Sequence, residues 1–348
     1  MTVSEQLKLS QMKNEHPMIT VCPGTLREGF DTYSPYVRRK LFDGKNVSHI
    51  LQYYPPTREE NAELFRDNRK RISISGVQEK VSVLLDGKTL RLTNEGEQGT
   101  YILKPIPRDL KKVGEVPANE HLTMQIAEQI YGIRTARNAL IFFLDGTPAY
   151  ITRRFDVRAD GTKWGKEDFA SLAGMTESNA GPGFKYDYSY DKLGALMRKF
   201  VPAWRIEIEY YFAVVYFNYL FSNGDAHLKN FALLETVDGD YRLSPFYDLI
   251  NTRMHVDDTP FALNGGLFDN AQRSDVYLGT GYPNRIDFVK FGSILGMQDK
   301  RVEKILERFN HVDPQQIENM IDRSFLSKSG KRGYVVDYRT RRNKLEAS

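Results

Sequence analysis

The chain of 348 residues has little of three things that often reveal a protein's class: cysteine, long apolar runs and charge of one sign. Its only cysteine, Cys22, excludes an internal disulfide and a cysteine-rich zinc cage, and it fits a reducing compartment. No run reaches the roughly 18 apolar residues that a membrane span needs. The polar start, residues 1–17, lacks the apolar core of a secretory signal. We therefore expect a soluble, cytoplasmic protein without a membrane partner.

The charge is nearly balanced, with 49 Lys and Arg against 45 Asp and Glu, which gives a net charge of +4. This mild excess suits an anionic small ligand and is too small to predict direct DNA binding. The length predicts about two domains or lobes. With 41% hydrophobic residues, the chain has enough apolar side chains to fill their cores.

The region from residue 71 to residue 155 reads as strands. Asp86-Gly87 and Asp145-Gly146 each separate two β-prone runs, which is typical of a hairpin. One helix interrupts these strands; Pro117 marks its start and Gly132 its end. A β-rich unit with a single helix is what the N-lobe of a protein kinase contains.

The region after Asp156 reads as mainly helical. The predicted helices cover residues 190–200, 204–221 and 301–326, and the second is apolar almost all round, which predicts burial in a core. Asp238-Gly239 predicts one more hairpin. We therefore expect an α+β, two-lobed, protein-kinase-like fold with an N-terminal extension (1–65), a β-rich N-lobe (66–157) and a helical C-lobe (158–348).

A polar loop follows the predicted buried helix and carries Asp225 and, five residues later, Asn230. Asp248 follows the next hairpin. This spacing matches the kinase pattern in which an Asp accepts the proton of the attacking hydroxyl, while an Asn and a second Asp hold Mg²⁺. Asp and Asn also simply stabilise turns, but their joint spacing favours phosphoryl transfer.

Two further residues of this loop are candidates for the catalytic machinery. Lys229 is placed to neutralise the transferring phosphate, and His227 to brace the loop by a hydrogen bond. A histidine that only packs the loop is at least as plausible as a chemical one.

Lys104 ends an apolar strand and would direct its charge at the α- and β-phosphates of ATP. Glu120, on the following helix, is the candidate ion-pair partner. The alternatives are a surface lysine at a strand end and a solvated glutamate near a helix start.

Residues 71–80 lie where a kinase has its phosphate-covering loop, although they contain one glycine and no GxGxxG. Backbone N–H groups in this loop are candidates for phosphate contacts; the residues are Ser75, Gly76, Val77 and Gln78. Ser73 and Ser75 are candidate autophosphorylation sites.

A set of motifs in a fixed order is similar to the HipA family of bacterial toxin serine/threonine kinases. The motifs are RISISGVQEK (71–80), ILKP (102–105), NE (119–120), RRFD (153–156), GDAHLKN (224–230) and PFYD (245–248). The resemblance covers roughly residues 65–330. It implies ATP- and Mg²⁺-dependent phosphorylation of a protein serine and arrest of translation, with aminoacyl-tRNA synthetases among the known targets.

The resemblance also assigns roles to individual residues. Asp225 is the catalytic Asp, Asn230 and Asp248 are the metal ligands, and Lys104 is the phosphate-binding lysine. Arg153, Arg154 and Phe155 become the hinge that contacts adenine through backbone groups, and Ser73 matches the inhibitory autophosphorylation serine.

The paired serines and the short N-terminal segment resemble the HipT branch of this family. That branch implies two partners, a helix-turn-helix antitoxin and a small antitoxin that resembles the missing N-terminal subdomain. The segment around Cys22 resembles a cysteine-bearing knuckle, but one cysteine should not bind zinc.

Two other functions stay open at this point. One is a small-molecule kinase, because the same Asp–Asn–Asp set serves such enzymes, and the other is a pseudokinase that binds a DNA-binding antitoxin. The tail from residue 328 to 344 is basic, and a solvated helix face is favoured there over an RNA or partner contact; its arginines include Arg332, Arg339, Arg341 and Arg342.

Overall fold

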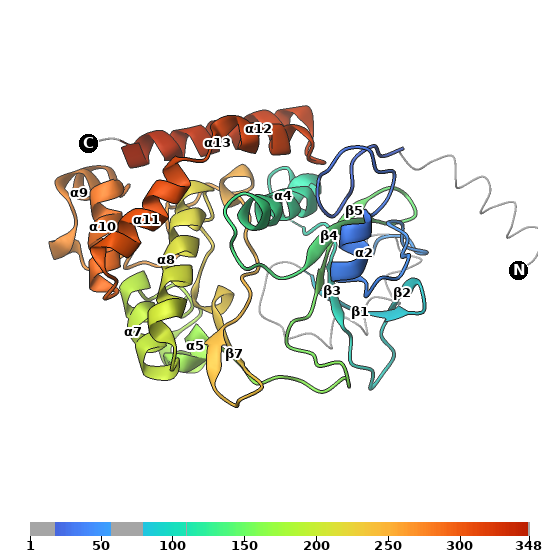
Figure 1. Ribbon diagram of the computed structural model, residues 1–348, viewed down its shortest axis with the longest axis horizontal. Helices are drawn as coiled ribbons and strands as arrows, with labels where there is room; N and C mark the ends of the chain where they lie inside the picture. The colour runs from blue at the N-terminus through green and yellow to red at the C-terminus, as the bar shows by residue number, and fades with distance from the viewer. Residues whose placement is uncertain (1–17, 57–78, 109, 347–348) are drawn as a thin grey trace, which may run out of the picture. The chain divides into compact units, whose positions relative to one another are not determined.

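The structure is a computed structural model that describes residues 18–56, 79–108 and 110–346. It divides into two compact units (Figure 1). The sheet unit comprises the described residues of the ranges 1–122, 136–154 and 323–326. The helical unit comprises those of the ranges 123–135, 155–322 and 327–348.

The sheet unit is built on an antiparallel sheet with the strand order β2-β1-β3-β5-β4. The strands are β1 (Val81–Asp86), β2 (Thr89–Leu92), β3 (Tyr101–Lys104), β4 (Asn138–Phe142) and β5 (Pro148–Arg153). Gly87 and Gly146, with φ of 59° and 79°, adopt the left-handed conformation that the tight turns require, so both predicted hairpins are confirmed. Strand β3 lies at the centre of this sheet and carries Lys104 at its end.

The N-terminal part of the chain packs into the core of the same unit. Helix α2 (Pro35–Leu41) begins at Ser34, whose hydroxyl accepts a hydrogen bond from the Val37 amide. Two buried tyrosines join this segment to the strands: Tyr33 donates to the Leu140 carbonyl and Tyr101 to the Leu41 carbonyl, each at 2.7 Å. The described part of the segment 1–65 is therefore integral to the sheet unit.

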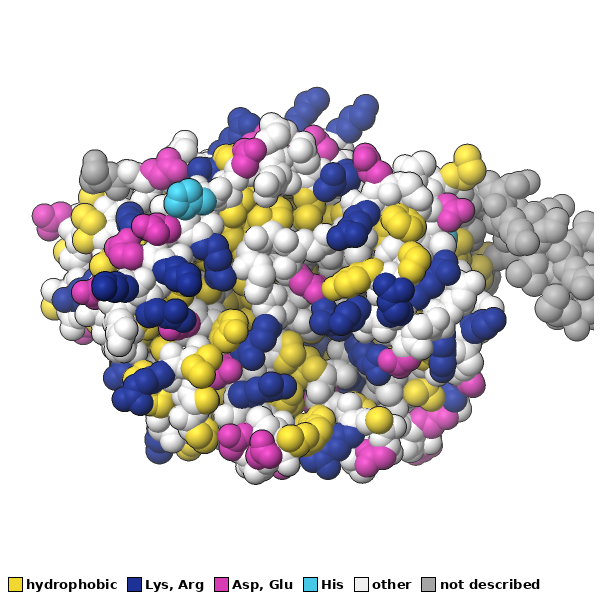
Figure 2. Space-filling view, in the orientation of Figure 1, with side chains coloured by type: hydrophobic (Ala, Val, Ile, Leu, Met, Phe, Trp, Pro, Cys, Tyr) yellow, Lys and Arg dark blue, Asp and Glu magenta, His cyan; other side chains and the backbone are white. Residues whose placement is uncertain are grey.

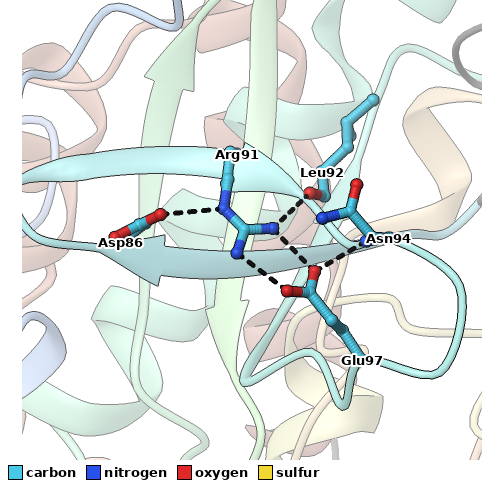
Figure 3. A network of polar contacts seen from close by, with 5 residues as sticks. All are labelled: Asp86, Arg91, Leu92, Asn94 and Glu97. Carbon is cyan, nitrogen blue, oxygen red and sulfur yellow. Dashed lines mark hydrogen bonds and ion pairs between the residues drawn. The ribbon is translucent and has the colours of Figure 1, made fainter.

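An arginine fastens the loop between β2 and β3 (Figure 3). Arg91 donates to both carboxylate oxygens of Glu97, at 2.7 and 2.9 Å, and to Asp86 at 3.1 Å. These hydrogen bonds, with one from the Asn94 amide, lower the pKa of Glu97 to about 2. The network lies at the surface and joins the two strands to the loop that follows them.

The helical unit surrounds helix α8 (Trp204–Leu220). Figure 1 shows α7, α10, α11 and α13 around it. The helices are α5 (Phe169–Leu172), α6 (Glu177–Ala180), α7 (Tyr190–Phe200), α9 (Asp275–Thr280), α10 (Arg285–Ile294), α11 (Asp299–Asn310), α12 (Pro314–Asp322) and α13 (Lys328–Glu346). A small antiparallel sheet, β6-β7-β8, completes the unit; its strands are β6 (Lys166–Asp168), β7 (Ala232–Glu235) and β8 (Tyr241–Leu243).

Most predicted helices match, but the stretch 301–326 is two helices, α11 and α12. The break precedes Pro314, because proline lacks an N–H group and its ring clashes with the preceding turn of a helix. Helix α4 (Val116–Gln129) contains Pro117 near its start, and Gly132 follows it with φ of 62°. Among the described helices, none is long and apolar enough to cross a membrane.

Shortening a core side chain of β3 should weaken the sheet unit. Leu103 is fully buried between two paired strands, so Leu103→Ala should lower the free energy of unfolding by about 3 kcal/mol through lost burial and the cavity left behind. Urea denaturation followed by circular dichroism measures this loss. Lys88→Ala, at an exposed turn, is the control and should change stability by no more than about 0.5 kcal/mol. Equal losses would contradict the assignment of Leu103 to the core.

Candidate functional site

The loop with Asp225 begins where the buried helix α8 ends. Phe221 caps the helix, and Ser222 turns the chain with a φ of 55°. The short helix η2 (Leu228–Asn230) and strand β7 follow directly. The loop is thus anchored at both ends in the core of the helical unit, while Asp225 itself is exposed.

The carboxylate of Asp225 has a fixed neighbour. The Tyr186 hydroxyl donates to Asp225 Oδ1 at 2.9 Å. The segment that carries Tyr186 is itself tied to the loop, because the Leu228 amide donates to the Lys185 carbonyl at 3.1 Å. Tyr186 therefore orients the Asp225 carboxylate through one of its two oxygens.

The structure brings the two candidate metal ligands together. Asn230 Nδ2 lies 3.5 Å from Asp248 Oδ2. The side chain of Asn223 connects the Asp225 loop to the segment of Asp248. Its Nδ2 donates to the Asp248 backbone carbonyl at 3.2 Å, and its Oδ1 accepts from the Asp225 backbone amide at 3.3 Å. Asn230 Oδ1 is buried and has no hydrogen-bond partner among the described residues, so it is available to a ligand.

The backbone around these residues adopts unusual conformations. Ser222 and Asp248 have φ of 55° and 56°, the left-handed region that non-glycine residues rarely enter. At Gly224, an added Cβ would lie 2.3 Å from Asp258 Oδ2 and 2.6 Å from the Thr259 carbonyl oxygen. Only glycine fits at this position without displacing the loop.

His227 behaves as a packing residue of the loop. Burial lowers the pKa of His227 to about 4, so its ring is neutral near pH 7. Its backbone amide donates to the Asp225 carbonyl at 2.8 Å, and its ring meets the Tyr186 ring edge-on at 5.3 Å between centroids. These contacts favour the bracing role over proton transfer.

The carbonyl of Lys229, at the neighbouring position, accepts a hydrogen bond from the Tyr247 hydroxyl at 2.9 Å. Lys229 Nζ lies 6.0 Å from the centre of the Phe184 ring. The predicted contact of Lys229 with a phosphate stays a prediction.

In the sheet unit, Lys104 and Glu120 form a buried ion pair. Lys104 Nζ lies 2.6 Å from Glu120 Oε1, and the two side chains are only 5% and 3% exposed. Lys104 Nζ also lies 5.2 Å from the centre of the Tyr150 ring, across the β3–β5 register. Lys104 is thus not a surface lysine, and Glu120 is not a solvated one.

In the predicted hinge, residues 153–155, fewer backbone N–H groups remain for a contact with adenine than expected. The Arg153 amide donates to the Arg137 carbonyl at 2.8 Å and the Arg154 amide to the Thr100 carbonyl at 2.9 Å. Two of the three amides are thus used inside the sheet unit, which leaves carbonyl groups and the Phe155 amide as candidates for adenine. The Arg153 side chain pairs with Asp43 at 2.5 Å.

The predicted phosphate-covering and autophosphorylation residues lie outside the described residues: Ser73, Ser75, Gly76, Val77 and Gln78.

Sequence reasoning missed three residues that shape the site: Tyr186, Asn223 and Thr252. Thr252 Oγ1 accepts from the Gly224 amide at 2.8 Å, and its own amide donates to the Ser222 carbonyl at 3.0 Å. Asn223 adjoins the motif and could have been found by its position. Tyr186 and Thr252 lie 39 and 28 residues from their partners, and no local pattern marks them.

Comparison with known proteins places the chain in a family. The family model described as the HipA-like C-terminal domain matches residues 72–316. A Haemophilus influenzae protein provisionally named a kinase is 23% identical over 325 residues, 88% of this chain and 91% of that protein. The serine/threonine-protein kinase toxin HipA of Shewanella oneidensis is 26% identical over 212 residues, 55% of this chain and 46% of the toxin.

A solved structure shows the same fold. It is the complex of Shewanella oneidensis HipA and HipB with operator DNA, in which one chain aligns with a TM-score of 0.59 and 20% identity. The alignment covers 78% of this chain and 63% of that chain. The protein therefore belongs to the family with a HipA-like C-terminal domain, and its α+β kinase-like fold is confirmed.

The buried ion pair of the sheet unit can be tested without an activity assay. Glu120→Gln should lower the free energy of unfolding by about 3 kcal/mol, because it removes the carboxylate that compensates the buried Lys104 charge. Lys104→Met combined with Glu120→Leu removes both charges and should be less destabilising than the single change. Urea denaturation of the three proteins measures both effects. A larger loss in the double variant would show that contacts other than this charge pair dominate.

Proposed function

We propose that this protein is a serine/threonine protein kinase that transfers the γ-phosphoryl group of ATP to a protein hydroxyl. The observation that carries the proposal is the convergence of Asn230 and Asp248, linked through Asn223 to the loop of the exposed Asp225. A base open to a substrate, next to two oxygen ligands, is what phosphoryl transfer requires. Membership of the HipA-like family supports the same reaction.

The residues present fit a magnesium ion. Mg²⁺ prefers oxygen ligands and is often held by only one or two protein groups together with substrate phosphates. Asn230 Oδ1 is a buried acceptor without a partner among the described residues, and the Asp248 carboxylate lies beside Nδ2 of the same amide group. A bound Mg²⁺ would offset the negative charge of the phosphates.

The proposed step uses the two oxygens of Asp225 differently. Oδ1 is occupied by the Tyr186 hydroxyl, so Oδ2 would accept the proton of the substrate hydroxyl. That hydroxyl oxygen forms a bond to the γ-phosphorus, and the bond from this phosphorus to the β,γ-bridging oxygen breaks. ADP leaves, and Asp225 keeps the proton until solvent removes it.

Lys104 would supply a cation for phosphate oxygens. Its ion pair with Glu120 fixes the ammonium group before any ligand arrives, which spares the side-chain entropy of ordering a flexible lysine. Lys229, inside the catalytic loop, is the proposed second cation. Carbonyl groups of residues 153–155 would contact adenine.

The biological role that we propose is that of a toxin kinase of the HipT-like branch. Its substrate would be a translation-related protein such as an aminoacyl-tRNA synthetase, and Ser73 or Ser75 would be modified by autophosphorylation. The related HipA was solved together with HipB and operator DNA. By analogy, we propose a helix-turn-helix antitoxin partner and, beside it, a second small antitoxin.

Replacing the proposed base should abolish transfer and spare nucleotide binding. With labelled ATP and Mg²⁺, Asp225→Asn should lower phosphoryl transfer by about 100-fold or more, because proton acceptance is lost while no phosphate contact is removed. Mass spectrometry of residues 65–85 should find phosphate on Ser73 or Ser75 in the wild type only. Asp187→Asn, an exposed change close to Tyr186, is the control and should behave as the wild type.

Two results would overturn this assignment. Unchanged transfer by Asp225→Asn would remove Asp225 from the role of base. No transfer by unmodified wild-type protein to itself or to bacterial lysate proteins would favour the pseudokinase, or the small-molecule kinase if ATP turnover appeared with a small acceptor.

Removing the proposed metal ligand Asp248 should weaken ATP binding when Mg²⁺ is present but not when it is absent. Asp248→Ala should weaken ATP binding about tenfold or more in the presence of Mg²⁺ and change it little in the presence of EDTA. Isothermal titration calorimetry gives both affinities. Asp238→Ala, in the exposed turn of the β7–β8 hairpin, is the control. Equal affinities of wild type and Asp248→Ala with Mg²⁺ would exclude Asp248 as a metal ligand.

A further inference from the structure

The C-terminal helix α13 lies outside the residues matched by the family model, which end at 316. In the orientation shared by Figures 1 and 2, α13 lies at the upper side of the helical unit, where lysine and arginine side chains project into solvent. One arginine of this helix differs. Arg341 is only 1% exposed, so its assignment to a solvated basic face is wrong.

Arg341 lies against the start of the catalytic loop. Its Nε donates to Ser222 Oγ at 3.1 Å. Its guanidinium carbon lies 5.1 Å from the centre of the Tyr219 ring and 4.8 Å from that of Tyr282. A buried charge is costly unless it is compensated, so an arginine held here indicates a specific task.

Ser222 is the residue at which the chain leaves α8, in the left-handed conformation. A serine in this conformation costs about 1 kcal/mol relative to ordinary backbone, and it persists only where neighbours hold it. The Thr252 amide donates to the Ser222 carbonyl oxygen at 3.0 Å, and Thr252 Oγ1 lies 3.0 Å from the same oxygen. Arg341 holds its side chain, so the residue is fixed from both sides.

Asp258 is a negatively charged residue near Arg341, Ser222 and Thr252. It is hydrogen-bonded to Thr252 Oγ1, the atom that also receives the Gly224 amide. Burial raises the pKa of Asp258, and the nearby Thr252 and Arg341 oppose that rise. Asp258 is thus a half-buried carboxylate that lies against the catalytic loop at Gly224, and the positive charge of Arg341 opposes the rise of its pKa.

A second residue on the same face of α13 binds the segment that follows Asp248. Asp337, one helical turn before Arg341, accepts from Asn251 Nδ2 at 3.2 Å and pairs with Arg253 Nε at 3.3 Å. The Tyr338 ring stacks on Phe221 at 5.3 Å. Helix α13 thus contacts side chains of the segment before Asp225 and side chains of the segment after Asp248.

We propose that Arg341 is a positioning residue for phosphoryl transfer: by holding Ser222 in its left-handed conformation, it sets the path of the Asp225 loop. This inference rests on the proposed kinase function and makes α13, outside the matched family range, a required part of the catalytic apparatus. Arg341 acts through Ser222 and does not touch the reacting groups.

Hydrogen exchange of backbone amides tests the proposal without any activity. In Arg341→Met, exchange should rise about tenfold in residues 222–230 and 250–256, because local opening becomes easier, and stay unchanged in residues 81–92 of the sheet unit. Arg339→Met, which removes the same charge from an exposed site of the same helix, should leave all of these segments unchanged.

Kinetics give the second readout. Arg341→Met should lower kcat by about 10- to 100-fold with the KM for ATP within about twofold, since displacing a catalytic group affects the chemical step more than nucleotide binding. Arg341→Lys keeps a cation that can reach Ser222 Oγ and should recover most of the loss. If Arg341→Met does not fold, Ser222→Ala removes only the acceptor and should lower kcat in the same direction.

The outcomes separate the two proposals. A wild type without phosphoryl transfer but with the predicted exchange pattern would refute the kinase function and leave Arg341 as the anchor of this loop. Arg341→Met matching Arg339→Met in both exchange and kcat would overturn the positioning role. Faster exchange spread evenly over both units would overturn it as well, because Arg341 would then only stabilise the fold.

Discussion

The candidate site depends first on the burial of helix α8. The residues that face its neighbours are large and mainly apolar, and several contact aromatic rings of α10; Phe212, for example, stacks on Phe291 at 5.8 Å between centroids. Such pairs add about 1 kcal/mol each beyond the burial of their area. Near the start of the helix, the buried Glu207 accepts from the Leu243 amide of β8 at 3.2 Å. One rigid helix therefore holds the Asp225 loop at one end and the hairpin between Asn230 and Asp248 near the other.

The charged residues of the candidate site differ in their exposure to solvent: Asp225 is exposed, whereas Lys104 and Glu120 are buried. The exposure of Asp225 is what the proposed role of base requires, since the substrate would arrive from solvent. Lys104 and Glu120 are buried, and their desolvation roughly offsets their attraction, so such a pair is a poor source of stability. The pair fixes a cation in one direction, which a surface lysine with four rotatable bonds does not achieve. A cation fixed in this way fits the proposed contact of Lys104 with phosphate oxygens.

The features that could be predicted from the sequence are those set by residues close to one another along the chain. The Asp-Gly hairpins and helices α7 and α8 follow from turn chemistry and apolar spacing, and the structure confirms them. The ion pair of Lys104 and Glu120 was expected as one of two alternatives, because burial decides between them and a single strand end does not show burial. The division at residues 65 and 157 stays a prediction.

Contacts across long stretches of sequence were not predictable. Arg341 reads as one more basic residue of a charged helix, and only the packing of α13 against Ser222, 119 residues away, shows that it is buried. Tyr186 lies in an aromatic segment without a motif, so its hydrogen bond to Asp225 had no local signal. Sequence motifs identify candidate functional residues. The residues that orient them can be identified only from tertiary contacts.

The loop is held in a state that its own backbone does not favour. Ser222 and Asp248 are both left-handed, and Asn230 Oδ1 is buried without a partner among the described residues. An unsatisfied buried acceptor costs about 1–3 kcal/mol, and each left-handed residue adds about 1 kcal/mol. Asn223, Thr252 and Arg341 oppose relaxation, since each bonds directly to one of the left-handed residues. At the proposed metal site, a cation held by Asn230 and Asp248 would satisfy this acceptor, and a site whose groups are already in place for the ligand is a preorganised one.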